Sequence, residues 1–200
     1  MSDPLERALR APAPEAREAA RRFSDRAAAE HLADLAYTTV PSPVGELLVV
    51  GSARGLARLH YLDEPLDAVL AELARTRSPR IVESGAALEE WRRELDEYFG
   101  GRRRRFEAPL DWAQMPPFQR RVLHATAAIP YGETSTYSEV AAGAGKPRAQ
   151  RATGNALGAN PLPIVVPCHR VLRRGGGFGG YTGGLERKRY LLELEGVSGI

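Results

Sequence analysis

The spacing of apolar residues changes from helical to alternating early in the chain. Between Glu15 and Leu35 apolar side chains, mostly alanine, recur at helical spacing, which predicts a loosely docked helix with a weakly apolar face. β-Prone runs and then helical patterns follow, at 37–40, 47–51, 56–62, 65–76 and 86–99. Strands followed by helices in this order indicate an α+β fold.

Short helices dominate the pattern in the second half of the chain. Two prolines at 116–117 suit the first turn of a helix that we expect over 118–129. Thr136 and Glu139 have the spacing of a capping box, in which the two side chains satisfy backbone amides at a helix start. A further helix is expected over 148–159, so the sequence predicts a helix-turn-helix.

The end of the chain combines an apolar run, a glycine-rich stretch and a last helix. We expect a buried strand at Leu162–Val166, a loop over 175–184 and a helix over 185–194. Together with the changes of pattern upstream, this predicts three parts, namely a helical extension over 1–36, a small α/β domain over 37–110 and a mostly helical domain over 111–200.

Positive charge is concentrated in the last part of the chain. From Met115 onward, eleven Lys and Arg face five Glu, so this part carries +6 and the rest carries −3. A basic domain beside a mildly acidic one fits a polyanion-binding module, although chance asymmetry explains the charge equally well. Four arginines at 102–105 are interpreted as a solvated loop in preference to a nucleic-acid-binding arm.

Composition narrows the class of protein. Hydrophobic residues make up 43 % and charged residues 26 %, which is ordinary for a globular chain. The apolar runs are too short to span a bilayer and no apolar signal segment opens the chain, so we expect a cytoplasmic protein without a membrane partner. Cys168 is the only cysteine, which excludes an internal disulfide and a multi-cysteine zinc site.

The helix expected over 148–159 has an unusually small surface. Gly154 and Gly158 each cost about 1 kcal/mol relative to alanine, so close approach to another backbone is expected to offset them. That neighbour is either a packed protein segment or a DNA groove. Arg151 is the one long cation among these small residues, and it either reaches into a duplex or lies as an ordinary surface arginine.

Cys168 stands at the end of the predicted strand and is followed by His169 and Arg170. A lone cysteine usually packs as a small hydrophobe. Neighbouring cations, however, lower the pKa of a thiol from about 8.5 toward neutrality and so supply the nucleophilic thiolate. Because adjacent residues of an extended strand point apart, a water or a local turn would have to connect the thiol to the imidazole.

The segment Ile164–Val171, with the sequence Ile-Val-Val-Pro-Cys-His-Arg-Val, closely resembles the active-site motif of the O6-alkylguanine-DNA alkyltransferases. Further matches occur in the family's order, at 130–134, Tyr137, 151–160, 183–185 and 195–196. The resemblance implies a small N-terminal RNase-H-like α/β domain, to which 37–110 is similar, and a mostly helical C-terminal domain with a helix-turn-helix. Residues 1–36 have no counterpart.

The resemblance implies how DNA would be held. The family turns the damaged guanine out of the duplex, because its O6 atom cannot be reached inside the stack. The helix-turn-helix enters the minor groove, which small residues such as Ala152 and Gly154 suit. Arg151 matches the family's arginine finger, which fills the gap left by the base. Tyr137 matches the tyrosine that pushes on the neighbouring phosphate and donates a proton toward the guanine ring.

The resemblance also implies the chemistry of the site. Cys168 is expected to be the nucleophile, His169 a general base acting through a water, and Glu195 the carboxylate that orients and stabilises the histidine. The expected pocket residues are Asn160, which braces the turn before the active site, the carbonyl of Val171, and the backbone amides near Tyr181 and Thr182.

The function implied is DNA repair by stoichiometric transfer of a methyl or other alkyl group from O6-alkylguanine, with O4-alkylthymine as an alternative, to Cys168, which inactivates the protein. We expect double-stranded DNA containing alkylated guanine as the partner, no cofactor, no metal and a monomer. Two other interpretations stay open. One is a non-catalytic lesion-binding protein, and the other is a transcription regulator, which the sparsely polar recognition helix disfavours. The glycine-rich loop at 175–180 leaves the accepted alkyl size open.

Overall fold

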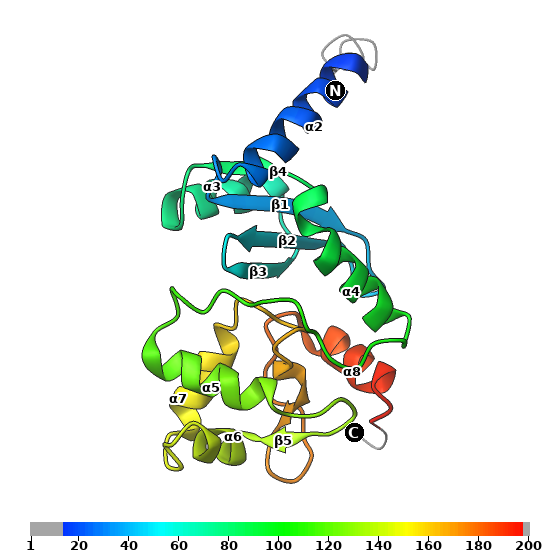
Figure 1. Ribbon diagram of the computed structural model, residues 1–200. Coiled ribbons are helices and arrows are strands. Elements are labelled where there is room, and N and C mark those ends of the chain that lie inside the picture. The colour runs from blue at the N-terminus through cyan, green and yellow to red at the C-terminus, as the bar shows by residue number, and fades with distance from the viewer. Residues whose placement is uncertain (1–13, 198–200) are drawn as a thin grey trace, which may run out of the picture.

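The computed structural model describes residues 14–197, which form a projecting helix, a sheet domain and a helical domain (Figure 1). The sheet domain contains β1 (Leu35–Val40), β2 (Leu47–Ser52), β3 (Gly55–Tyr61), β4 (Ile81–Glu83), α3 (Leu66–Thr76), η1 (Ala86–Leu88) and α4 (Glu89–Phe99). The strands lie in the order β3-β2-β1-β4. β2 is antiparallel to both of its neighbours, whereas β4 is parallel to β1.

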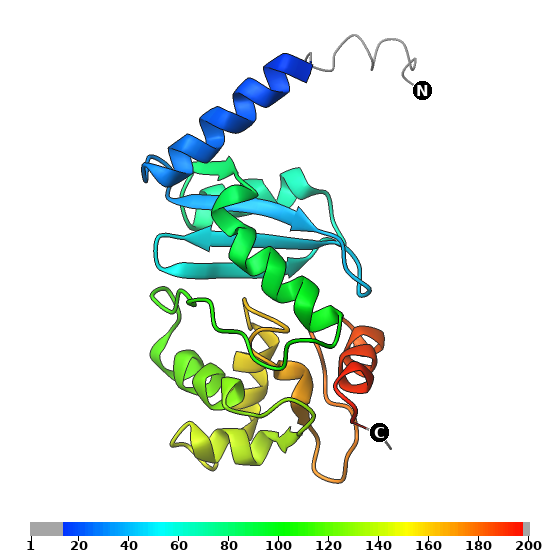
Figure 2. The same ribbon diagram turned by 45° about the vertical axis from the view of Figure 1, so that its right-hand side comes forward.

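The sheet is buried on both faces, and β2 shows why. Its residues Leu48 and Val50 pack with the apolar face of α3. The alternate residues Leu47 and Val49 join the larger core, which α4 and the helical domain complete. Figure 2 shows α4 crossing the sheet. Because successive side chains of a strand point to opposite faces, one continuous apolar run supplies two cores.

Two parts of the sheet domain differ from what the sequence predicts. The helical pattern expected to reach Leu35 ends at Ala29, and Leu35 is the first residue of β1. The sequence does not predict β4, because three residues are too few to show a period. This strand forms only through its long-range pairing with 35–37 of β1.

Helix α2 (Pro14–Ala29) contacts the sheet domain through its last turns, while its first turns project away from the body of the protein (Figures 1 and 2). Ala27 is the buried residue of this helix. Asp25 accepts a hydrogen bond of 2.6 Å from Ser84, which anchors the same end. Phe23, in contrast, is 71 % exposed. This agrees with the expectation of a loosely docked helix.

The helical domain follows the pattern of its sequence closely. Its elements are α5 (Pro117–Ala127), β5 (Ser135–Thr136), α6 (Tyr137–Gly143), α7 (Gln150–Gly158), η2 (Cys168–Arg170), β6 (Val171–Leu172) and α8 (Leu185–Leu194). The predicted capping box opens α6, with Glu139 N–H donating to Thr136 Oγ1 at 3.3 Å and Thr136 N–H donating to Glu139 Oε2 at 2.7 Å. Helices α6 and α7 are the expected helix-turn-helix, and both pack against α5.

The strand expected at Leu162–Val166 is wrong. The segment is buried, but it folds as tight turns with Ile164 in the left-handed region at a φ of 72°. Prolines explain this, since they lack the N–H that a strand ladder needs; they stand at 161, 163 and 167. The carbonyl of Pro161 accepts a hydrogen bond of 2.8 Å from Leu59 N–H of β3. The segment therefore covers the edge of the sheet and joins the two domains.

Candidate active site

Cys168 begins the single turn of η2 and does not end a strand. Its side chain is almost buried, at 5 % exposure. Asn160 holds it in place, because Asn160 Nδ2 donates to Cys168 Sγ at 3.2 Å and to Val166 O at 2.9 Å. The thiol lines a cavity of about 650 Å³ between α7 and the loop that precedes α8. Asn160 therefore fixes the sulfur at the edge of this cavity.

His169 and Glu195 form a buried pair beside Cys168. His169 Nε2 lies 2.9 Å from Glu195 Oε1, and both side chains are fully buried. Arg170 donates to the same carboxylate through Nε and Nη2 at 2.7 and 2.8 Å, and Tyr98 OH donates at 2.7 Å. Burial alone would raise the pKa of Glu195, but the hydrogen bonds from His169 and Arg170 outweigh it and hold the pKa at about 2. The carboxylate is therefore ionised.

The bond to Glu195 determines which nitrogen of His169 can act as a base. An ionised carboxylate only accepts, so Nε2 carries the proton and Nδ1 of the neutral ring carries the lone pair. Within residues 14–197, Nδ1 is buried and makes no hydrogen bond. Burial lowers the pKa of His169 more than Glu195 raises it, so the ring is neutral near pH 7. A neutral imidazole with a free lone pair can accept a proton from a thiol.

The expectation that adjacent cations lower the pKa of Cys168 is wrong. Burial raises the pKa of this thiol to about 11, and the hydrogen bond from Asn160 and the charge of Lys188 oppose it only in part. Arg170 directs its guanidinium away, to Glu195 and to the carbonyl of Ile129 at 2.6 Å. Cys168 therefore rests as a thiol, and its proton has to leave in the course of a reaction.

Three segments meet around the cavity, and their closest approach requires a glycine at position 179. Tyr137, the first residue of α6, lies against Gly154 of α7, where an added Cβ would be 3.7 Å from the ring. Gly179 is tighter, since an added Cβ there would be 2.1 Å from Tyr137 OH. Thr182 Oγ1 donates to the carbonyl of Gly158 at 2.9 Å and ties the loop to the end of α7. The Cβ on Gly154 would thus be in ordinary van der Waals contact, and a Cβ on Gly158 would meet no atom within 4 Å. Close approach of another protein backbone therefore does not explain the two glycines of α7, contrary to one of the two expectations from the sequence.

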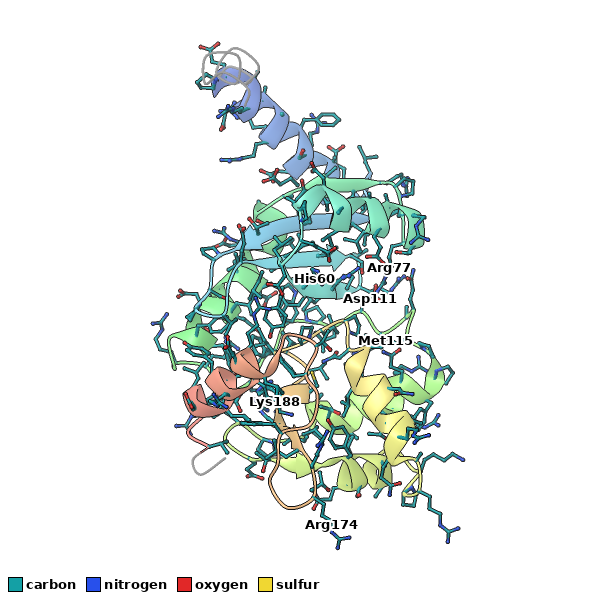
Figure 3. The ribbon with its side chains drawn as sticks, turned by 180° about the vertical axis from the view of Figure 1, so that it is seen from behind. His60, Arg77, Asp111, Met115, Arg174 and Lys188 are labelled. Carbon is teal, nitrogen blue, oxygen red and sulfur yellow. The ribbon has the colours of Figure 1, made fainter. Side chains whose placement is uncertain are left out.

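The cavity brings together most of the predicted site residues. Those that line it are Cys168, Tyr137, Arg151, Gly154, Tyr181 and Thr182. Arg173, an exposed cation that sequence reasoning did not assign to the site, lines it too. Arg174 follows at the outer end of the same loop (Figure 3). Ala152 is exposed on α7 but does not line the cavity. The structure therefore places a cationic rim beside a partly apolar pocket.

Two predicted pocket residues, Asn160 and Val171, lie behind the cavity and do not line it. Val171 is fully buried, and its carbonyl accepts a hydrogen bond of 2.6 Å from Lys188 Nζ. Lys188, labelled in Figure 3, is itself fully buried, and burial lowers its pKa to about 8. Its position three residues before Leu191 on α8 could have shown that it points inward.

Sequence reasoning also missed Tyr98, which reaches Glu195 from the other domain. No local signal marks it, because the two residues are 97 positions apart. The arginine run at 102–105 is partly neutralised on the sheet domain, where Arg102 pairs with Asp96 at 2.8 Å and Arg103 pairs with Glu97 at 2.8 Å. These ion pairs favour the loop interpretation for the first half of the run.

Neither a membrane span nor a metal site is found in the part of the chain that the structure describes. None of its helices is both long and apolar enough to cross a bilayer. Among residues 14–197, no three His, Cys, Asp or Glu side chains are grouped so that they could hold a metal ion.

Comparison with known families covers both domains. A family described as 6-O-methylguanine DNA methyltransferase, ribonuclease-like domain, matches residues 35–112, and its DNA binding domain matches 117–197. The chain belongs to the 6-O-methylguanine DNA methyltransferase family. This confirms the expected fold class, a small ribonuclease-like α/β domain followed by a mostly helical DNA-binding domain. Helix α2 precedes both matched regions of the methyltransferase family.

Relatives in this family match the chain over most of their length. A methylated-DNA–protein-cysteine methyltransferase of Mycolicibacterium paratuberculosis is 43 % identical over 159 residues, which are 80 % of this chain and 91 % of the relative. The inducible enzyme of Bacillus subtilis is 41 % identical, over 74 % of this chain and 82 % of its own. A crystal structure of Mycobacterium tuberculosis OGT in complex with DNA is 40 % identical with a TM-score of 0.69, over 80 % of this chain and 92 % of that one.

Proposed function

We propose that this chain repairs alkylated DNA by transferring the alkyl group from O6 of guanine directly to Cys168. The observation that carries the proposal is a buried thiol at the edge of a cavity, next to a histidine base that an ionised carboxylate holds. Relatives named methylated-DNA–protein-cysteine methyltransferase support the same reaction. Cys168 is the one cysteine of the chain and therefore the one thiol that can accept the alkyl group.

The reaction is an in-line displacement at the alkyl carbon. The thiol proton of Cys168 passes through a water to His169 Nδ1, and the sulfur forms its bond to the carbon. The carbon–oxygen bond breaks, its electron pair goes to O6, and a proton from the hydroxyl of Tyr137 neutralises the guanine ring. Burial raises the pKa of Tyr137, so the hydroxyl holds its proton until then. The proton that His169 has accepted then replaces, in net terms through solvent, the one that Tyr137 has lost.

Glu195 stabilises the imidazolium that forms when His169 accepts the thiol proton. Its carboxylate is already ionised and already in contact with Nε2, so no rearrangement is needed as the charge develops. The product is a thioether, which water does not cleave at a useful rate. Each molecule therefore acts once, and the atoms balance without any cofactor.

DNA is proposed to lie along α6 and α7, with the damaged base in the cavity. Gly154 and Ala152 keep the surface of α7 low enough for a narrow groove, and Arg151 fills the space that the base leaves. Arg173 stands on the rim, where it can meet a phosphate. We propose that the protein works as a monomer on double-stranded DNA, because one chain holds every group that the reaction uses. We also propose that it works in the cytoplasm.

The direct test of this function is the intact mass of the protein after incubation with an O6-methylguanine duplex. We expect a gain of one methyl group per chain, located on Cys168 by peptide mapping, and no gain with the unmodified duplex. Tight binding of the lesion without a change in mass would identify a non-catalytic lesion-binding protein instead. Preference for one undamaged sequence would favour a transcription regulator.

Arg151→Ala is expected to slow repair of duplex DNA by roughly ten- to a hundredfold, which corresponds to about 1.4 to 2.8 kcal/mol of lost support for the extruded base. Reaction with the free base O6-benzylguanine should change little, since no duplex has to be held open. Single-turnover rates on the two substrates measure this. The matched control is Arg148→Ala, which removes an exposed arginine outside the cavity lining. Equal losses on both substrates would contradict the role of Arg151.

Gly179→Ala is expected to slow alkyl transfer, because its Cβ would lie 2.1 Å from Tyr137 OH and would displace either the hydroxyl or the loop. A positioned proton donor contributes roughly a hundredfold or more to a rate, so we expect its partial displacement to slow transfer by roughly ten- to a hundredfold. Gly177→Ala is the matched control, because a Cβ at Gly177 meets no atom within 4 Å and this residue does not line the cavity. Similar rates for the two variants would show that Tyr137 does not need this contact.

A further inference from the structure

We propose that Tyr61 of the sheet domain is a positioning residue, which fixes Tyr181 and thereby the wall of the cavity that receives the alkyl group. Tyr61 is the last residue of β3, and its hydroxyl oxygen lies 2.7 Å from that of Tyr181. Tyr181 lines the same cavity as Cys168, and its ring stands edge-on to that of His169 with centroids 6.4 Å apart. The inference rests on the alkyl transfer proposed above.

Tyr61 can hold Tyr181 because Tyr61 is itself immobilised. Its side chain is only 5 % exposed, and the guanidinium of Arg187 lies over its ring at 4.5 Å from the centroid. Arg187 is fixed in turn by two hydrogen bonds of 2.6 Å to the carboxylate of Asp63 and by one of 2.7 Å to Val44 O. Asp63 and Val44 belong to the sheet domain and Arg187 to α8. The contacts of Arg187 that immobilise Tyr61 therefore join the two domains.

Gly183 shows how closely the two tyrosines are packed. A Cβ at this position would lie 2.5 Å from Tyr61 Cε2 and 2.9 Å from Tyr181 Cε1. The backbone of the loop therefore passes against both rings, which meet edge-on with centroids 6.3 Å apart. On its other side Tyr181 borders the cavity, and the hydrogen bond between the hydroxyls opposes movement of its side chain in that direction.

The hydroxyl pair is the part of this arrangement that acts on the cavity. Each hydroxyl satisfies the other, so removing one leaves a polar atom in a mostly apolar site without its partner. Tyr181 would then sample other positions, and the substrate would have to order its side chain each time it binds. A larger alkyl group covers more of the wall, so its transfer depends more on a fixed Tyr181 than the transfer of a methyl group does.

The test compares Tyr61→Phe, Tyr181→Phe and the double variant, which keep both rings and remove only hydroxyls. Tyr190→Phe is the matched control, because Tyr190 packs against the same core from α8. Single-turnover rates are measured with the free bases O6-methylguanine and O6-benzylguanine, together with Tm and affinity for unmodified duplex DNA. Methylation of the wild-type protein at Cys168 tests the underlying function separately.

We expect both single variants to transfer the benzyl group about three- to tenfold more slowly and the methyl group less than threefold more slowly, with unchanged affinity for DNA. The double variant should be no slower than either single variant, and its Tm should be at least as high, since no unpaired hydroxyl remains. Tyr190→Phe should leave the ratio of the two rates unchanged. A wild-type ratio in Tyr61→Phe, or losses that multiply in the double variant, would overturn the proposal.

Discussion

Cys168→Ala is expected to abolish alkyl transfer completely while the protein still binds DNA that contains the lesion. The substitution removes the one thiol of the chain, and no other side chain that lines the cavity is a comparable nucleophile. The cavity is formed by α6, α7 and the loop before α8, so its shape should survive the loss of one buried sulfur. Intact mass and fluorescence anisotropy with a methylated duplex measure transfer and binding in the same sample.

Cys168→Ser is the matched control for the loss of the thiol. A serine hydroxyl can still accept the hydrogen bond that Asn160 donates, so the local geometry should be kept. It should nevertheless transfer nothing, because a hydroxyl is a far weaker acid than a thiol and His169 cannot deprotonate it to a useful extent. Any gain of a methyl group by either variant would place the acceptor on another residue and would refute the assignment of Cys168.

The helical domain could be predicted from its sequence because its signals are local. The capping box of Thr136 and Glu139 forms within one turn of α6, and prolines mark the start of α5 at the expected place. The apolar run at 162–166 shows the limit of such reasoning. Its hydrophobicity predicted burial correctly, but the flanking prolines decided the backbone conformation, and a strand was the wrong interpretation.

In the site, too, most of the residues could be predicted from the sequence, whereas features that depend on contacts between distant residues could not. The motif around Cys168 and the distant Glu195 could be identified from the family resemblance. Charge near the thiol in the sequence did not predict its pKa, however, because Arg170 turns to Glu195 and burial dominates the environment of the sulfur. Tyr98 and Tyr61 come from the sheet domain and reach the site only through the docking of the two domains, which no periodicity encodes.

Glu195→Gln is the obvious way to test whether Glu195 supports His169 as a base, but the other contacts of Glu195 complicate that test. Glu195→Gln would weaken His169 as a base, but it would also leave the guanidinium of Arg170 buried without its counter-charge. Breaking a buried ion pair in this way costs about 3–5 kcal/mol, so a slow Glu195→Gln protein could simply be unstable. The sharper variant is His169→Gln, whose amide can still donate to the carboxylate but has no basic nitrogen.

His169→Gln is expected to slow methyl transfer by roughly a hundred- to ten-thousandfold at neutral pH, which is the usual contribution of a general base. The pH dependence should identify the cause. In the wild-type protein the rate should be flat above about pH 7, because burial lowers the pKa of His169 and the neutral ring is already available to take the thiol proton. Without the base, the thiol has to ionise by itself, and its pKa is about 11. The rate of His169→Gln should therefore rise about tenfold for each pH unit between roughly pH 7 and pH 9.

The measurement is the single-turnover rate of the wild-type protein and of His169→Gln across this pH range, with the Tm of each protein recorded. A variant that is slow but has the flat profile of the wild type would show that His169 supports the fold and does not carry the proton.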